Sequence, residues 1–142
     1  MGGDHGAAIV GSMRAALAVR RGDPQAADRA LAMAYQAALE TQDMPIVAMV
    51  AVAAAGLAVL RERWHDAAVL LGAAARLRGS HDHTDLAVRD VTGKARAALG
   101  NEAFTEAYAA GWALDAAAAQ SQIDPARLTR PSLPAGPQAR RA

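Results

Sequence analysis

Apolar and polar residues follow one another at helical spacing through most of this chain of 142 residues. Between Asp4 and Arg21, apolar positions recur three or four residues apart, which predicts a helix. Gly22 then predicts a left-handed helix end, and Asp23 followed by Pro24 predicts the cap and first position of a second helix. The residues of the first helix predicted to pack inward are Ile9, Met13, Ala16, Leu17 and Arg20.

A third segment is apolar on every side. It begins at the cap Asp43 and includes fifteen uncharged residues, Ile46 to Leu60. A membrane-spanning helix needs about 20 apolar residues, so the segment predicts a buried core helix. We expect this third helix to be the least exposed element.

Three more helices are predicted, at about residues 64–78, 84–99 and from 101 onwards. Asp82 or Thr84 is expected to cap the fifth helix, and Asn101 the sixth. After Ile123 the chain becomes rich in Pro and Arg. The pattern therefore predicts an all-α domain over residues 1–122, with about six helices in three antiparallel hairpins, and a tail over residues 123–142 that is disordered or loosely docked.

Composition supports a helical fold and excludes several kinds of chemistry. There are 40 alanines, only 4% aromatic residues and no cysteine, so disulfides and thiolate chemistry are excluded. Residues 1–123 carry 11 basic and 13 acidic side chains, which leaves no basic stripe for nucleic acid. The N-terminus has no secretory signal pattern, so we expect a cytoplasmic protein without membrane contact.

Two predicted hairpins also resemble each other. Residues 17–27 (LAVRRGDPQAA) and 57–68 (LAVLRERWHDAA) lie 40 or 41 positions apart, and the similarity includes the turn as well as the alanines. A helix, a turn, an aromatic residue and then alanine resemble a tetratricopeptide unit. The resemblance implies hairpins stacked as a right-handed solenoid.

A more specific resemblance covers the second half. Residues 64–78 (WHDAAVLLGAAARLR), 95–100 (ARAALG) and 102–114 (EAFTEAYAAGWAL) resemble the C-terminal tetratricopeptide-like region of large actinobacterial transcriptional regulators, of the LuxR and antibiotic-regulatory types. The resemblance implies a regulatory module whose partners are its own copy, or neighbouring repeats or domains of a regulator. The chain contains no Walker A sequence and no basic helix-turn-helix, so nucleotide hydrolysis and DNA binding are not implied for it.

Candidate catalytic and metal sites are weak. His81, Asp82, His83 and Asp85 have ligand chemistry, but a solvated loop is the favoured interpretation. His65 and Asp66 fit the first turn of a helix. We therefore predict no catalytic residue, no metal and no cofactor, and a protein that is not an enzyme.

Two sets of residues are candidates for binding. Trp64, Tyr108 and Trp112 are large side chains among alanines, and they fill the core or line a groove for a ligand or partner. The first helix carries an apolar face that we expect to stack on another repeat or form a dimer: Ile9, Val10, Met13 and Leu17. These sets predict a protein-interaction module, with a sensor of a small apolar effector near Tyr108 or Trp112 as the alternative.

Overall fold

The computed structural model describes residues 5–129, and within that range it contains helices and no strand. The predicted all-α class is confirmed, but these residues form eight helices instead of six. They are α1 (His5–Arg20), α2 (Pro24–Thr41), α3 (Met44–Leu60), α4 (Trp64–Arg78), α5 (Leu86–Leu99), α6 (Asn101–Trp112), α7 (Ala116–Ile123) and α8 (Ala126–Thr129). No described helix is long and apolar enough to cross a membrane.

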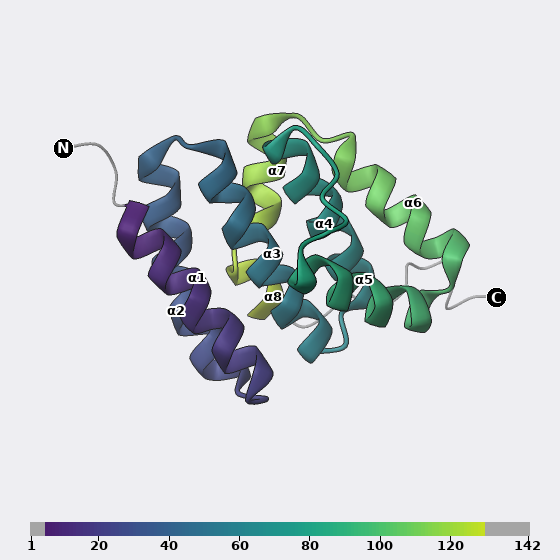
Figure 1. The fold of residues 1–142 in the computed structure, drawn as a ribbon, viewed down its shortest axis with the longest axis horizontal. Coiled ribbons are helices and arrows are strands. Elements are labelled where there is room, and N and C mark those ends of the chain that lie inside the picture. Colours follow the sequence, from purple (N-terminus) through teal and green to yellow (C-terminus); the bar gives the residue numbers. More distant parts are fainter. Residues whose placement is uncertain (1–4, 130–142) are drawn as a thin grey trace, which may run out of the picture.

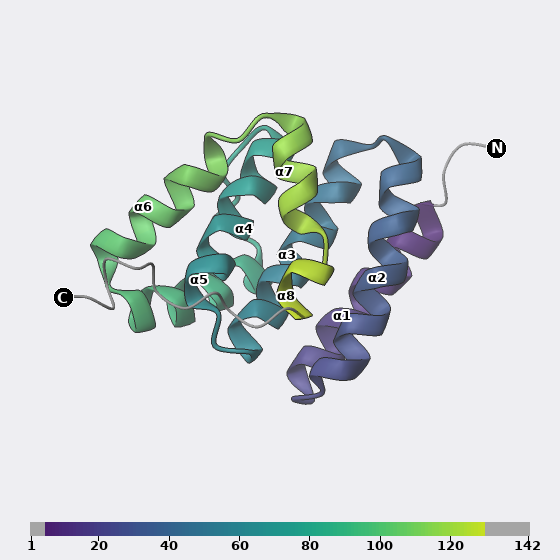
Figure 2. The same cartoon turned by 180° about the vertical axis from the view of Figure 1, so that it is seen from behind.

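The first four helices form two hairpins, α1–α2 and α3–α4, and α3 lies at the boundary between them. α1 packs on α2, both pack on α3, and α3 packs on α4. Figure 1 shows α1 in front of α2 and α5 in front of α4, while α2, α7 and α8 lie nearest the viewer from behind (Figure 2). α5 also packs on α3, so α1, α3 and α5 lie on one side of the molecule.

The similarity between residues 17–27 and 57–68 has a structural counterpart in the two turns. At the ends of α1 and α3, two backbone amides donate hydrogen bonds to carbonyls three and five residues earlier, which is the bonding pattern of a Schellman motif. Gly22 (φ 72°) and Glu62 (φ 59°) occupy the same left-handed position, forty residues apart. The bonds are Gly22 to Val19 and Asp23 to Ala18 in the first turn, and Glu62 to Val59 and Arg63 to Ala58 in the second.

The most buried helix is α4, and the prediction that the third helix would be the least exposed is wrong. Ten of the 15 residues of α4 are buried, compared with nine of 17 in α3. The reason is position: α4 is covered by α3, α5, α6 and α7. The uninterrupted apolar sequence of α3 does not reveal this, because one side of α3 borders a groove described below.

The helices α4 and α6 approach each other closely at two glycines. A Cβ atom added to Gly72 would lie 2.1 Å from the carbonyl oxygen of Tyr108, and one added to Gly111 would lie 2.1 Å from that of Val69. Only glycine leaves room for this backbone contact. Gly72 lies in residues 64–78 and Gly111 in residues 102–114, two segments singled out in the sequence.

The inward face of α1 differs from the predicted one. Gly11 faces α2 so closely that an added Cβ would lie 2.8 Å from the Cβ of Ala34. Small residues therefore form the contact, and the larger Met13 and Leu17 remain outside, 65% and 45% exposed. The buried residues of α1 are Ala8, Gly11, Ser12, Ala15 and Ala18.

The fifth helix also differs from its prediction. Asp85, not Asp82 or Thr84, accepts hydrogen bonds from the first amides of α5. Leu86, the first residue of α5, is 78% exposed, and only Val91 and Ala95 of this helix are buried. In α6, Asn101 is the first helical residue and no side chain caps the helix.

The C-terminal helices fold back over the domain. Asp115 caps α7, which packs on α4 and α3, and the hydroxyl of Tyr35 donates a hydrogen bond to the carbonyl of Gln120 at 3.0 Å. Ile123 and Leu128 are buried, so the packed chain continues beyond the predicted boundary at residue 122. The rest of the predicted tail, residues 130–142, lies outside the described residues.

Candidate binding surfaces

Three side chains join the loop between α4 and α5 to helix α6. The imidazole of His81 stacks on Trp112 with 4.1 Å between ring centres, and its Nδ1 is hydrogen-bonded to the hydroxyl of Tyr108 at 2.7 Å. Partial burial raises the pKa of Tyr108, and the positive charge of Arg78 opposes that rise. Two of the predicted site residues, Tyr108 and Trp112, therefore lie together. Both contact His81, a residue that the sequence pattern assigned to a solvated loop.

Behind this cluster lies a cavity of about 320 Å³, which we call the α4–α5–α6 cavity. It exists because α5 and α6 diverge from Gly100 (φ 88°) while both still contact α4 (Figure 1). The alanines of α4 that line the cavity have short side chains, which leave space inside it. Its lining residues are Leu71, Ala74, Ala75, Arg78, Asp82, His83, Val88, Thr92, Arg96, Phe104, Thr105 and Tyr108.

Trp64 lies apart from the other two aromatic residues. It is the first residue of α4, and it borders a separate hollow of about 240 Å³ together with Val19 of α1 and Val91 of α5. The three aromatic residues singled out in the sequence therefore do not line one common groove.

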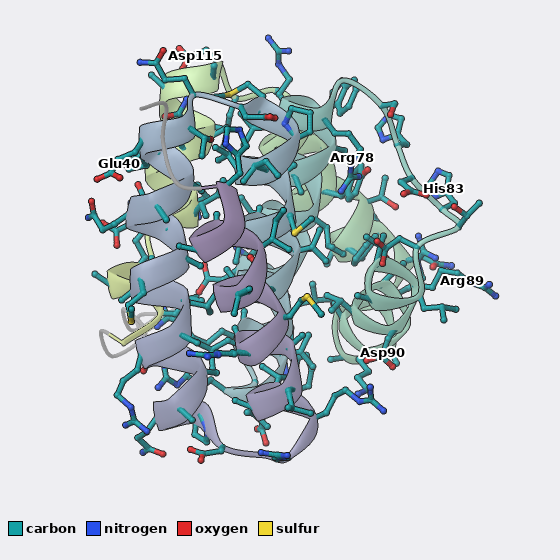
Figure 3. All side chains as sticks on the ribbon, turned by 60° about the vertical axis from the view of Figure 1, so that its left-hand side comes forward. Glu40, Arg78, His83, Arg89, Asp90 and Asp115 are labelled. Carbon is teal, nitrogen blue, oxygen red and sulfur yellow. The ribbon has the colours of Figure 1, made fainter. Side chains whose placement is uncertain are left out.

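A second surface crosses the side formed by α1, α3 and α5. A groove of about 340 Å³, which we call the α1–α3–α5 groove, is lined by Met13 of α1, Met49 of α3 and Ala87 of α5, among others. Arg78 and Asp82 line this groove and also the α4–α5–α6 cavity. In Figure 3, Arg78 lies between the helices, whereas Arg89 points outward from α5.

An apolar ridge on α1 continues the groove outward. Val10, Met13 and Leu17 are 45%, 65% and 45% exposed, and they recur at i, i+3 and i+7 on one side of the helix. Ile9 is half-buried next to them. The four residues predicted as a stacking face are thus all at least partly accessible.

The polar loop between α4 and α5 is organised around Asp82. One carboxylate oxygen accepts hydrogen bonds from the amide and hydroxyl of Thr84 and from the amide of Asp85, and these bonds lower the pKa of Asp82. Within residues 5–129, no three His, Asp or Glu side chains converge as a metal site would require.

Comparison of the chain with protein-family models, with curated proteins and with solved structures finds no significant match.

Proposed function

We propose that this chain is a non-catalytic helical module that binds a segment of another protein, as the regulatory part of a bacterial transcriptional regulator. The observation that carries the proposal is the exposed ridge of Val10, Met13 and Leu17 beside the α1–α3–α5 groove. Apolar side chains that are contiguous and exposed on a helix are typical of an interaction surface. The repeated turn and the shared side of α1, α3 and α5 support a tetratricopeptide-like solenoid arrangement.

Charge specifies the partner further. α1 contains no acidic residue, and the exposed Arg14 and Arg20 flank the ridge. A partner helix with an apolar stripe and acidic flanks complements this surface. In a two-fold contact through this face, a second copy would bring the same arginines and no acidic residue of α1. The proposed partner is therefore an amphipathic, acidic helix of another chain or domain.

Two peptides with the same apolar helical stripe, one flanked by Glu and one by Lys, test this proposal by fluorescence anisotropy. The Glu peptide should bind the wild type and lose binding to the Ile9→Glu/Met13→Glu variant. Met33→Glu is the matched control, since Met33 is 73% exposed but lies on α2, outside the ridge. Sedimentation of the wild type and the double variant shows whether a second copy covers the ridge.

A dimer that the double variant abolishes would replace the proposed partner with a second copy. Equal binding of both peptides by all variants would refute the ridge as the interaction surface. A monomer that binds neither peptide would refute the proposed function.

A further inference from the structure

The α4–α5–α6 cavity combines apolar walls with a positive rim. Leu71, Val88 and Phe104 supply the apolar surface, and its volume of about 320 Å³ lies at the lower end of the range for small-molecule sites. This volume equals that of about ten liquid water molecules at ~30 Å³ each. The cavity therefore suits a compact molecule larger than an ion.

Two arginines border the cavity without fixed hydrogen-bond partners. Among the described residues, neither Arg78 nor Arg96 donates a hydrogen bond or forms an ion pair, and the Arg96 guanidinium lies 4.6 Å from the centre of the Phe104 ring. Both side chains stand in the last turn of a helix, yet neither bonds the terminal carbonyls there. Their donors are free to meet a ligand.

The single acidic residue in the lining, Asp82, offsets only one of the two arginines, so the lining keeps a net positive charge. One oxygen of Asp82 is occupied by its own loop, through the bonds from Thr84 and Asp85. His81 holds that loop against α6 through Tyr108 and Trp112, so the mouth is formed before any ligand arrives. A preformed site binds with less ordering than a mobile one.

We propose that the α4–α5–α6 cavity binds a small amphipathic anion, whose apolar body contacts Leu71, Val88 and Phe104 and whose carboxylate lies next to both Arg78 and Arg96. This site is separate from the α1 ridge, and it does not depend on the proposed protein partner. An arginine is the side chain best suited to a carboxylate, because its planar donors match the two oxygens.

Isothermal titration calorimetry with phenylacetate and indole-3-acetate, each compared with its neutral amide, tests the proposal. We expect saturable binding of one carboxylate per chain, with Kd on the order of 10⁻⁴ M, and at least about fivefold weaker binding of the amides. Equal affinity for acid and amide would overturn the role of the arginines, and the absence of saturable binding to folded protein would overturn the site.

Matched variants locate the binding. Arg96→Gln should weaken the carboxylates about fivefold or more, whereas Arg89→Gln on the same helix, with its side chain in solvent (Figure 3), should not. Thr105→Phe places a ring at the mouth without replacing a buried residue, and Ala103→Phe puts the same ring on α6 outside the lining. Carboxylate binding unchanged by both Arg96→Gln and Thr105→Phe would show that the anion binds elsewhere.

Discussion

Gly72 and Gly111 set the distance between α4 and α6. Each glycine lacks a Cβ atom, and a backbone carbonyl of the other helix occupies the space that this atom would fill. Their presence in residues 64–78 and 102–114 has a physical explanation in this crossing. The chain needs glycine at both positions because the contact is made by the backbone, and backbone atoms cannot rotate out of the way as side chains do.

Alanine at either position should therefore be strongly destabilising. We expect Gly72→Ala or Gly111→Ala to lower the free energy of unfolding by about 3 kcal/mol or more, as measured by urea denaturation. Gly93→Ala is the matched control, because Gly93 lies in α5 and the added Cβ would meet nothing within 4 Å beyond its chain neighbours and the nearby backbone of its own helix. It should gain about 0.5–1 kcal/mol from helix propensity. Equal effects at the three positions would contradict the close crossing.

The two tyrosines should make the free energy of unfolding depend on pH in the alkaline range. Burial raises the pKa of Tyr35 and of Tyr108, and the charge of Asp124 raises the pKa of Tyr35 further. Since the unfolded state releases these protons first, the stabilisation is complete below about pH 10 and is lost as pH rises through the folded-state pKa values. The free energy of unfolding should therefore fall above about pH 10.

Tyr35→Phe/Tyr108→Phe removes every tyrosine of the chain and should flatten this alkaline decrease. The ion pair between Lys94 and Asp90 is more than half exposed and contributes little to stability. Urea denaturation at several pH values between 8 and 11 measures the difference. An unchanged slope in the double variant would assign the decrease to other groups.

At the scale of elements, neighbouring positions on α3 face opposite environments. Val50 is fully buried, while Met49 is 38% exposed and borders the α1–α3–α5 groove. Val50→Asp should largely unfold the domain, because an unpaired buried charge costs about 3–5 kcal/mol against a total stability of about 5–15 kcal/mol. Met49→Asp should stay folded. Circular dichroism during thermal unfolding distinguishes them, and two similar melting curves would mean that α3 is placed wrongly.

The starts of α2 and α3 were predictable because cap chemistry is local. Asp23 and Asp43 each accept a hydrogen bond from an amide three residues later, with proline within the first turn, as their sequences indicated. By contrast, neither glycine nor proline marks the break between Trp112 and Ala116, so α7 was not predicted.

The candidate sites were less predictable because they depend on contacts between distant segments. Tyr108 was singled out as a rare large residue, but its partner His81 lies 27 positions earlier in a polar loop. The inward side of α1 was predicted wrongly because tight packing on α2 favours small residues at Gly11 and Ala34. In such an alanine-rich chain, the largest hydrophobic residues are not the best indicators of the core.

At the scale of the whole molecule, Arg78 connects the two hollows, since it lines both the α1–α3–α5 groove and the α4–α5–α6 cavity. If both proposed sites are correct, an acidic partner and a small anion compete for this one guanidinium. Binding of either should then weaken binding of the other by the same factor, because coupling between two ligands is reciprocal.

Peptide affinity measured with and without saturating phenylacetate tests this coupling. In the wild type we expect the Glu peptide to bind about threefold more weakly when phenylacetate is present, and phenylacetate to bind more weakly by the same factor when the peptide is present. Arg78→Gln should weaken each ligand alone and abolish the mutual effect. Arg96→Gln, which changes only the cavity, should weaken phenylacetate while leaving the peptide affinity unchanged. A mutual effect that persists in Arg78→Gln would show that the coupling passes through the loop held by His81 instead of through this side chain.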